Sequence, residues 1–517
     1  MKAKSSAFLI IVLAIMLSSA LSEAKLIQII HTNDLHSYFE GYRDGRGGYA
    51  RVKTVIDNLK KEAKEKDIEV LQLDAGDWGE GTSFFFTDQG ANSIRALDMF
   101  GTEVTLVGNH DHLLGGKVLG QQIKSANASM KFLSANLVQT KEMELGGLVK
   151  PVFDIEKNGI KIRVIGLSTE EPEFQYTLIP GFILPAIPTG LALSAQAKAE
   201  GKDLIIALTH LGQFQDKYLA KYSKDIDVIV GGHSHTRMDE VLLIKNKNKK
   251  DVPVVQAGSH GLVVGSLLLD VRGRGDVKVV SYKLHDVNAA ISENQEMKEF
   301  VDRVVESRDQ YFGGHFNDVV GESEVPLAGY VNGHPVIKKS CWGENLAKMN
   351  KEAVKADIGL HLAFFEGVSM AAGTVKFGDL VDNFPHVRNF NDPGWEISTF
   401  SAKGKIIKTI LKAIIQLDGH VGVNFYGLTY DSLTLPKSIP YAGGRVLSWG
   451  IKVNGEKMDD EKLYTVAIPT EVSYAVNTLF PKKVQNIMPA LAKTGKFFWP
   501  LMEEYMRNNS PIRCLSK

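Results

Sequence analysis

The chain has 517 residues, of which 44% are hydrophobic and 23% are charged, and its formal net charge is zero. This length exceeds what one ordinary hydrophobic core holds, so we expect a globular protein of two domains. A balanced charge implies no broad basic surface for nucleic acid or for an anionic membrane. Two cysteines, Cys341 and Cys514, are too few for a disulfide-dense scaffold or a cysteine-rich zinc module.

The first 24 residues have the pattern of a secretory signal. Lys2 and Lys4 precede an apolar run over 7–17, and small residues follow, with Ala20 and Ala24 as candidate cleavage points. The run is short for a bilayer span, so an uncleaved anchor is the less favoured alternative. We therefore expect an exported protein, periplasmic or extracellular, without a stable membrane anchor.

Short apolar runs typical of buried strands alternate with helix-like segments through the first half of the chain. The expected strands cover 26–30, 70–73, 105–107, 163–167, 204–208, 227–230, 254–257 and 267–271, and the expected helices cover 51–66 and 91–100. This alternation favours an α/β sandwich. The polar segment 293–311 has a helical pattern and is expected to connect to a second domain, with helices near 345–354 and 403–416.

Side chains with metal-ligand chemistry follow the ends of several expected strands. They are Asp34, His36, Asp77, Asn109, His110, His210, His233 and His235. An open α/β sheet places its chemistry beyond the carboxyl ends of its strands, so we expect these groups to converge. Carboxylate, amide and imidazole donors without a thiolate suit Zn, Mn, Fe or a similar divalent ion.

Seven of these groups are candidate ligands, which is too many for one ion with an open position. Two divalent metal ions that share a carboxylate would use them all, and such a pair clamps the attacking and leaving oxygens of a phosphoryl transfer. We expect His31, His260 and His285 to have structural roles only. The role of His112 is left open because it lies so close to His110.

The motifs DLH, GD, GNHD, THLG and GGHSH occur in this order with the spacing of calcineurin-like metallophosphoesterases, and the chain resembles the secreted 5′-nucleotidase family. The resemblance implies a signal peptide over 1–24, a four-layer α/β/β/α metallophosphoesterase domain over 25–292, a helical linker over 293–311 and an α+β substrate-binding domain over 312–517.

The resemblance also implies the ligand sets and the catalytic groups. One metal would be held by Asp34, His36 and His235, the other by Asn109, His210 and His233, with Asp77 bridging them. The catalytic residues would be His110, which would stabilise or protonate the transferring phosphate, with Asn109 and Asp111 beside it.

One departure from the family pattern concerns the orientation of His110. In these nucleotidases an aspartate three positions after the histidine usually orients it, and here that position is Leu113. An imidazole without such a partner loses control of its tautomer and ring position. Asp111 or His112 could substitute, although neither stands at the same place.

The second domain departs further from the family. The stretch 356–380 lacks the Asn-Gly-Gly loop that ends in arginine, and Ser369 falls about where the arginine would be. The late Gly-Gly-Asp-Gly-aromatic element is also missing, and 473–480 reads SYAVNTLF. Three residues remain as candidates for substrate binding: Phe390 for base stacking, with core packing as its alternative, and Arg388 and Lys339 for positive charge.

We therefore predict an exported dinuclear-metal phosphoesterase of 5′-nucleotidase type, monomer or dimer, that acts on a small-molecule phosphate ester, expected to be a nucleotide. One alternative keeps the metal centre and changes the substrate, as in a thiosulfohydrolase-like enzyme or another phosphatase. Another alternative is a catalytically weakened binding protein. In an oxidising compartment Cys341 and Cys514 could pair, and the sequence leaves this open.

Overall fold

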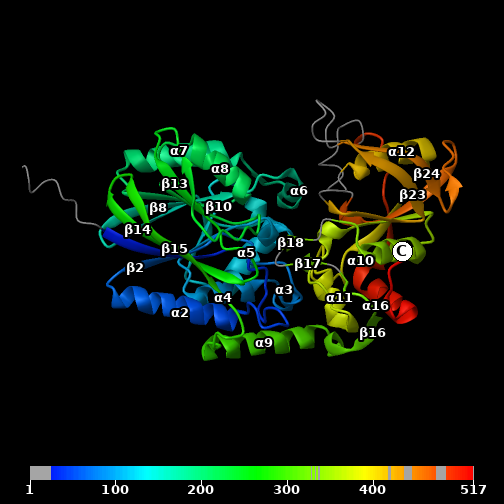
Figure 1. Ribbon diagram of the computed structural model, residues 1–517, viewed down its shortest axis with the longest axis horizontal. Coiled ribbons are helices and arrows are strands. Elements are labelled where there is room, and N and C mark those ends of the chain that lie inside the picture. Colours follow the sequence, from blue (N-terminus) through cyan, green and yellow to red (C-terminus); the bar gives the residue numbers. More distant parts are fainter. Residues whose placement is uncertain are drawn as a thin grey trace, which may run out of the picture.

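The computed structural model describes residues 25–327, 329–331, 334–335, 338–416, 421–435, 445–472 and 485–515. The expected signal peptide and the segment 473–480 lie outside these residues. Two domains stand side by side, and the long helix α9 runs beneath the first domain toward the second (Figure 1).

The first domain contains two mixed sheets. The first has the order β15 (Asp276–Asp286), β14 (Val263–Gly273), β1 (Lys25–Thr32), β2 (Glu69–Asp74), β3 (Val104–Leu106), β4 (Lys131–Leu133) and β6 (Val149–Lys150). The second has the order β12 (Leu242–Lys245), β13 (Asp251–Val255), β11 (Val228–Gly231), β10 (Leu204–His210), β8 (Ile160–Ser168) and β7 (Val152–Lys157). Within each sheet the central strands are parallel, so their carboxyl ends share one edge.

A continuous apolar layer lies between the two sheets. It includes Ile27, Leu71 and Leu106 of the first sheet and Ile162 and Val228 of the second, all fully buried. Strands covered on both faces read as unbroken apolar runs, which is why the sequence predicted them. Helices cover the outer faces: α2 (Tyr49–Glu65), α4 (Ala91–Phe100) and α5 (Gly116–Ala126) on the first sheet, and α7 (Ala186–Ala199) and α8 (Gly212–Tyr222) on the second. The four-layer sandwich is thereby confirmed.

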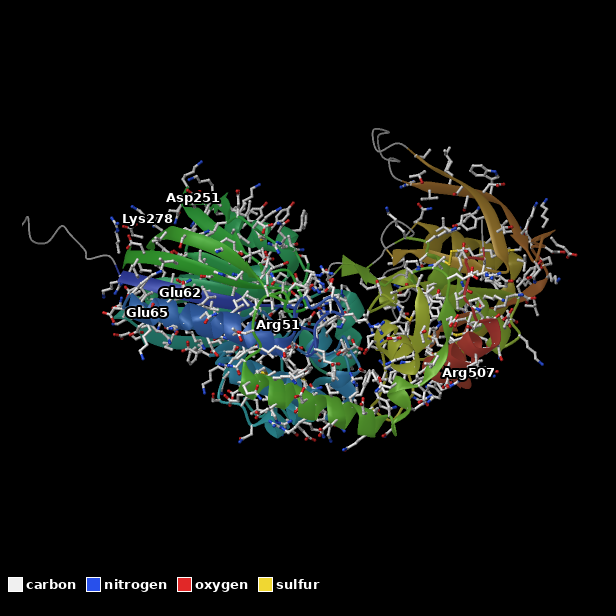
Figure 2. All side chains as sticks on the ribbon, turned by 60° about the horizontal axis from the view of Figure 1, so that its bottom comes forward. Arg51, Glu62, Glu65, Asp251, Lys278 and Arg507 are labelled. Carbon is white, nitrogen blue, oxygen red and sulfur yellow. A yellow bond between two sulfur atoms is a disulfide. The ribbon has the colours of Figure 1, made fainter. Side chains whose placement is uncertain are left out.

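Helix α2 has the expected amphipathic character. Val52, Ile56 and Leu59 are buried, whereas Glu62 and Glu65 are exposed on the outside of the domain (Figure 2). Helix α7 was not predicted from the sequence, because its apolar residues are distributed around the whole helix and leave no amphipathic stripe.

Helix α9 (Gln295–Tyr311) lies within the expected connector. The side chain of Asn294 accepts a hydrogen bond from the Met297 backbone N–H at 3.0 Å and so caps the helix. Met297, Phe300 and Val304 pack against the first domain. The helix is therefore anchored on the first domain before it reaches the second.

The second domain is an α+β structure, as expected. Its main sheet has the order β22 (Val423–Tyr426), β19 (Ile358–Leu362), β26 (Leu463–Pro469), β21 (Glu396–Lys403) and β27 (Ala492–Phe497). A three-stranded sheet joins β23 (Leu428–Thr434), β24 (Val446–Val453) and β25 (Glu456–Lys457), and β16 (Val319–Ser323) pairs with β20 (Gly373–Lys376). The helices are α10 (Cys341–Ala353), α11 (Phe377–Asn383), α12 (Gly404–Ile415) and α16 (Phe498–Asn509).

Shorter elements complete the described chain. They are the helices α3 (Phe84–Thr87) and α6 (Pro172–Gln175), the strand pairs β5 (Leu137–Val138) with β9 (Phe182–Ile183) and β17 (Tyr330–Val331) with β18 (His334–Pro335), and the 3₁₀ turns η1 (His110–His112), η2 (Lys141–Met143), η3 (Tyr176–Leu178), η4 (His315–Asn317) and η5 (Ala363–Phe365).

Cys341 and Cys514 form a disulfide, with their Cα atoms 4.8 Å apart and a sequence separation of 173. The bond ties the start of α10 to the tail that follows α16. Searched over the described residues, no helix has the length and apolar character that crossing a membrane requires.

Candidate metal centre

The strand-end side chains gather at the common edge of the two sheets. Asp34 and His36 follow β1, Asp77 follows β2 and Asn109 follows β3, while His210 ends β10 and His233 and His235 follow β11. Several of these residues, among them Asp34, Asp77 and His235, have a positive φ, so the chain turns sharply where it leaves each strand. All seven predicted metal ligands therefore lie in one cluster, in which His233 is partly exposed and the others are buried.

One half of the cluster surrounds Asp34. The Nε2 atom of His235 lies 3.3 Å from Asp34 Oδ1, and the backbone N–H of His233 donates to both carboxylate oxygens at 3.0–3.1 Å. The Nε2 atom of His36 lies 3.1 Å from His235 Nε2 and 3.7 Å from Asp77 Oδ2. Two carboxylates and two imidazoles thus face one small volume.

The other half centres on Asp77, whose Oδ2 lies 2.9 Å from His210 Nε2. Nearby, Asn109 Oδ1 lies 2.9 Å from His233 Nδ1. Possible ligand atoms of Asp77, His210 and His233 lie within 4.8 Å of one another, and so do those of Asp34, His36 and Asp77. Asp77 belongs to both groups, as a bridging carboxylate would.

The hydrogen bonds of two histidines fit a metal site. His36 Nδ1 donates to the Glu80 carbonyl at 2.6 Å, and His210 Nδ1 donates to the Ala75 carbonyl at 2.7 Å. In a neutral ring each Nε2 carries a lone pair aimed into the cluster. Burial alone would lower the pKa of His210, but the carboxylates of Asp77 and Asp34 raise it to about 10, so without a metal its Nε2 carries a proton toward Asp77 that a bound cation would replace. A backbone carbonyl that fixes the outer nitrogen is typical of metal-binding histidine, so the residues fit divalent ions.

The electrostatics of the cluster follow from burial and proximity. Burial alone would raise the pKa of Asp77, but the imidazoles of His210 and His110 hold it well below its usual range. Burial, together with the charge of His110, lowers the pKa of His36 to about 4, which favours the neutral ring that a metal requires. Asp77 is therefore ionised, and His36 is neutral, with a ring nitrogen that can bind a metal.

His110 lies beside the cluster rather than within it. Its backbone N–H donates to Asp77 Oδ1 at 2.8 Å, and its ring contacts the ring of His36 edge-on, with centroids 4.8 Å apart. Its Nδ1 lies 2.9 Å from Glu80 Oε2. Burial alone would lower the pKa of His110, but the carboxylates of Asp77 and Glu80 raise it to about 9.

Asp111 and His112, the expected substitutes for the orienting aspartate, make contacts with groups other than the His110 ring. Asp111 accepts hydrogen bonds from the backbone N–H groups of Asp77, Gly79 and Gly108 at 2.8–3.0 Å, so its carboxylate shapes the loops around the cluster. His112 Nδ1 lies 3.2 Å from Thr177 Oγ1. The structure thus places Glu80, not Asp111 or His112, against the ring of His110.

His260, for which the sequence predicts only a structural role, lies at the cluster. Possible ligand atoms of His36, His235 and His260 lie within 4.8 Å of one another. The His260 ring stacks on Tyr38 at 3.8 Å, and its Nδ1 lies 2.6 Å from Tyr42 Oη. The signal that would have found it is the same as for the other ligands, since His260 follows the parallel strand β13.

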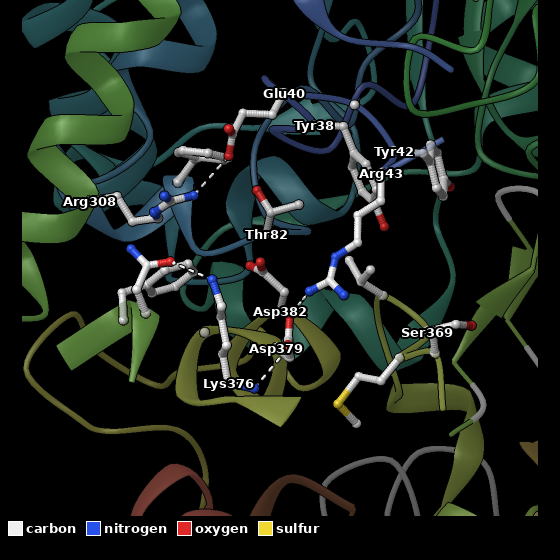
Figure 3. A pocket seen from close by; sticks show the side chains of 18 of the residues that line it. Tyr38, Glu40, Tyr42, Arg43, Thr82, Arg308, Ser369, Lys376, Asp379 and Asp382 are labelled. Atoms are coloured by element: carbon white, nitrogen blue, oxygen red, sulfur yellow. Dashed lines mark hydrogen bonds and ion pairs between the residues drawn. The ribbon is translucent and has the colours of Figure 1, made fainter. Parts of the chain in front are cut away.

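Tyr38 and Tyr42 also form part of a cavity of about 600 Å³ between the domains (Figure 3). Its wall combines the loop 38–44 and Thr82 with Ser369 and α11 of the second domain. Charged groups of this wall are already paired, with Arg308 Nη1 lying 3.0 Å from Glu40 and Arg43 contacting Asp379. The cavity therefore adjoins the metal cluster through the stacked Tyr38.

The three predicted substrate residues have different surroundings. Phe390 is partly buried and packs against Phe85 of the first domain, with ring centroids 5.5 Å apart. Arg388 lies 3.6 Å from the Glu471 carboxylate. Lys339 lies over the Tyr430 ring in a separate cavity of about 380 Å³. Their assignment to the substrate stays a prediction.

Comparison with known proteins finds two family matches. The calcineurin-like phosphoesterase family matches residues 27–237, and the 5′-nucleotidase C-terminal domain matches residues 319–472. A 5′-nucleotidase of Vibrio vulnificus is 26% identical over 94% of this chain and 91% of its own, and protein UshA of Yersinia enterocolitica is 32% identical over about half of each.

Solved structures with the same fold cover nearly the whole chain. A 5′-nucleotidase precursor from Thermus thermophilus has a TM-score of 0.79 at 24% identity over 95% of this chain and 98% of its own. The sulfate thiohydrolase SoxB of the same genus has a TM-score of 0.72 at 17% identity over 95% of each chain.

Proposed function

Because the chain belongs to the 5′-nucleotidase family of metal-dependent phosphoesterases, we propose that it hydrolyses a nucleotide or a related phosphate ester at a pair of divalent cations. The observation that carries this proposal is the convergence of seven donor side chains, with Asp77 common to both halves of the cluster. Asp34, His36 and His235 would hold one cation, and Asn109, His210 and His233 the other.

Cations bound there would polarise the ester phosphate and lower the pKa of an attacking water toward ~7. The chain supplies the rest of the chemistry. His110 has its Nδ1 committed to Glu80, which leaves Nε2 for the substrate. With a pKa of about 9 the ring carries a proton at neutral pH, so Nε2–H can donate to a phosphate oxygen or to the leaving oxygen.

A second candidate keeps the metal centre and changes the substrate. In the segment where the family pattern has arginine, the structure holds a fully buried Glu366 whose Oε1 lies 3.3 Å from His361 Nε2. Burial raises the pKa of Glu366 well above its usual range. A buried carboxyl cannot take the place of an arginine of the family's nucleotide pocket, and this loss supports a substrate other than a nucleotide, such as another phosphate ester or an organic thiosulfate.

The deciding experiment is a substrate panel on protein stripped with a chelator and reloaded with Zn²⁺ or Mn²⁺. Phosphate release from AMP in preference to an aryl phosphate supports the nucleotidase. Turnover of an aryl phosphate or an organic thiosulfate without AMP supports the second candidate. No turnover of any ester by the reloaded protein contradicts both. Asp77→Asn should abolish turnover, and Asp67→Asn, on an exposed turn, serves as its matched control.

Export is the remaining part of the proposal. The Cys341–Cys514 disulfide supports it, because structural disulfides persist in oxidising compartments. The basic and apolar pattern of the first 24 residues supports it independently. Fractionation of expressing cells checks it: the mature protein should be recovered outside the cytoplasm and should begin after Ala20 or Ala24.

A further inference from the structure

The carboxylate of Glu80 contacts one histidine from each domain. Its Oε2 lies 2.9 Å from Nδ1 of His110, and its Oε1 lies 3.1 Å from Nδ1 of His386 in the second domain. The Glu80 side chain is 5% exposed, and the two histidines are partly buried. A buried carboxylate that uses both oxygens in this way fixes the positions of both rings.

Glu80 is itself held close to the metal cluster. Its backbone carbonyl accepts the hydrogen bond from His36 Nδ1 at 2.6 Å, and the next residue is Gly81. A Cβ at position 81 would lie 2.5 Å from the Cβ of His36, so only glycine lets the loop pass this close. The loop therefore presents Glu80 between the metal ligands and the second domain.

His386 is fixed from the opposite side. Its Nε2 lies 2.9 Å from the Phe365 carbonyl, and its ring stacks on Trp395 with centroids 4.8 Å apart. Both ring nitrogens of His386 thus face oxygen acceptors. Burial alone would raise the pKa of Glu80, but the charge of His386 and the hydrogen bonds with His110 and His386 lower it to about 2, which keeps the carboxylate ionised.

The segment after Glu80 contacts the second domain through a hydrogen bond and through packed aromatic rings. The Ser83 backbone N–H donates to Asp382 Oδ1 at 2.7 Å. Phe86 packs against Trp499, with ring centroids 5.1 Å apart. The contact between Glu80 and His386 thus belongs to a docked interface and is not an isolated surface pair.

We propose that Glu80 is the positioning residue for His110, and that His386 holds Glu80 in place, so that docking of the second domain completes the catalytic site. This inference rests on the proposed phosphoesterase function. It assigns the orientation of His110 to Glu80. The hydrogen bond from His110 Nδ1 to Glu80 fixes the tautomer and aims Nε2 at the substrate. The second domain then contributes to kcat as well as to substrate binding.

The geometry of η1 provides a rescue variant. His110 and Leu113 are three positions apart on a 3₁₀ turn, and side chains at this spacing lie one above the other. An aspartate at 113 could therefore reach the His110 ring from the same turn. Leu113→Asp in a Glu80→Gln background replaces the lost carboxylate without restoring the contact to His386.

The kinetic experiment uses the metal-loaded protein with two substrates, an alkyl phosphate with a poor leaving group and p-nitrophenyl phosphate with a good one. Glu80→Gln should lower kcat for the alkyl ester by roughly 10–100-fold, with KM and bound metal unchanged, and affect the nitrophenyl ester less. Leu113→Asp should restore part of that loss. His386→Ala should lower kcat in the same direction, by a smaller factor.

Two matched controls accompany these variants. Glu65→Gln changes an exposed carboxylate on α2, and His315→Ala removes another histidine of the second domain, which contacts Asp318. Both should keep wild-type kcat. Wild-type kcat in Glu80→Gln, or an equal loss for both esters without rescue by Leu113→Asp, would overturn the proposal.

A spectroscopic measurement separates this proposal from the proposed function. A proton held between an imidazole nitrogen and a carboxylate gives a downfield proton resonance, and the pairs of His386 and His315 give separate ones. The resonance that is present in the wild-type protein and lost in His110→Gln reports the contact of His110 with Glu80, and it should also be absent in Glu80→Gln. If no ester is turned over but the resonance behaves in this way, the positioning contact stands and the phosphoesterase proposal fails. If the resonance persists in Glu80→Gln, the positioning proposal fails whatever the activity.

Discussion

The Nε2 atoms of His36 and His235 lie 3.1 Å apart at the buried edge where the two sheets meet. Because His36 Nδ1 donates to a backbone carbonyl, its Nε2 presents a lone pair toward its neighbour. Two nitrogens approach this closely when a cation or a shared proton lies between their lone pairs. The pair therefore gives the most direct test of the metal centre.

Removal of His235 should cost the protein one cation. We expect His235→Ala to retain about one metal equivalent fewer than the wild type, by elemental analysis after dialysis. Its turnover should fall more than the roughly 10–100-fold typical of losing an outer partner of a ligand. His285→Ala, on β15, is the control and should keep the full metal content. Unchanged metal content in His235→Ala would contradict the proposed ligand set.

The disulfide should stabilise the second domain. Closing a loop of this length restricts the unfolded chain, so Cys341→Ser with Cys514→Ser should lower the free energy of unfolding by ~2–5 kcal/mol. Thermal unfolding should show the loss in the transition of the second domain. Wild-type protein under reducing conditions should behave like the double variant. A wild-type transition temperature in the double variant would show that the bond is dispensable.

Asp227 should make stability depend on pH. Burial raises its pKa from 3.8 to about 7, although its carboxylate accepts a hydrogen bond from the Ile205 N–H at 2.9 Å. The folded state thus binds the Asp227 proton more tightly than the unfolded state does. The resulting contribution to the free energy of unfolding is complete below about pH 4 and is lost as the pH rises to about 7. This contribution amounts to at most ~4 kcal/mol.

Asp227→Asn stays neutral at every pH and keeps an acceptor oxygen. The variant should therefore gain thermal stability relative to the wild type between pH 4 and pH 8, as followed by its melting temperature. Asp276→Asn, which changes an exposed residue of β15, should track the wild type throughout. If the melting temperatures of Asp227→Asn and the wild type changed with pH in parallel, this expectation would be refuted.

Phe390 offers a test of nucleoside recognition. If the ring stacks on a base, Phe390→Ala should raise KM for AMP by ~10-fold, as stacking is worth about 1–3 kcal/mol, and leave KM for an alkyl phosphate unchanged. If the ring serves only to pack on Phe85, the two substrates should respond alike. Leu433→Ala, exposed on β23, controls for a general effect of truncating an apolar side chain of this domain.

The amino-acid sequence by itself determined the sandwich and the set of converging donors. Apolar runs such as 204–208 predict buried strands, and parallel strands bring whatever follows their carboxyl ends to one edge. His210, Asp77 and Asn109 could therefore be grouped although they are distant in the sequence. His260 and Glu80 also follow strands of these sheets, so the same rule extends to them.

Only the tertiary structure decided which groups surround His110 and whether the cysteines pair. The partner of His110 depends on how the tight loop at Gly81 turns and on how the second domain docks, and no local pattern encodes either. His386 comes from a segment 276 positions after His110, and nothing in its surrounding sequence distinguishes it from a core histidine. Contacts between domains depend on packing, because they join surfaces whose residues share no periodicity.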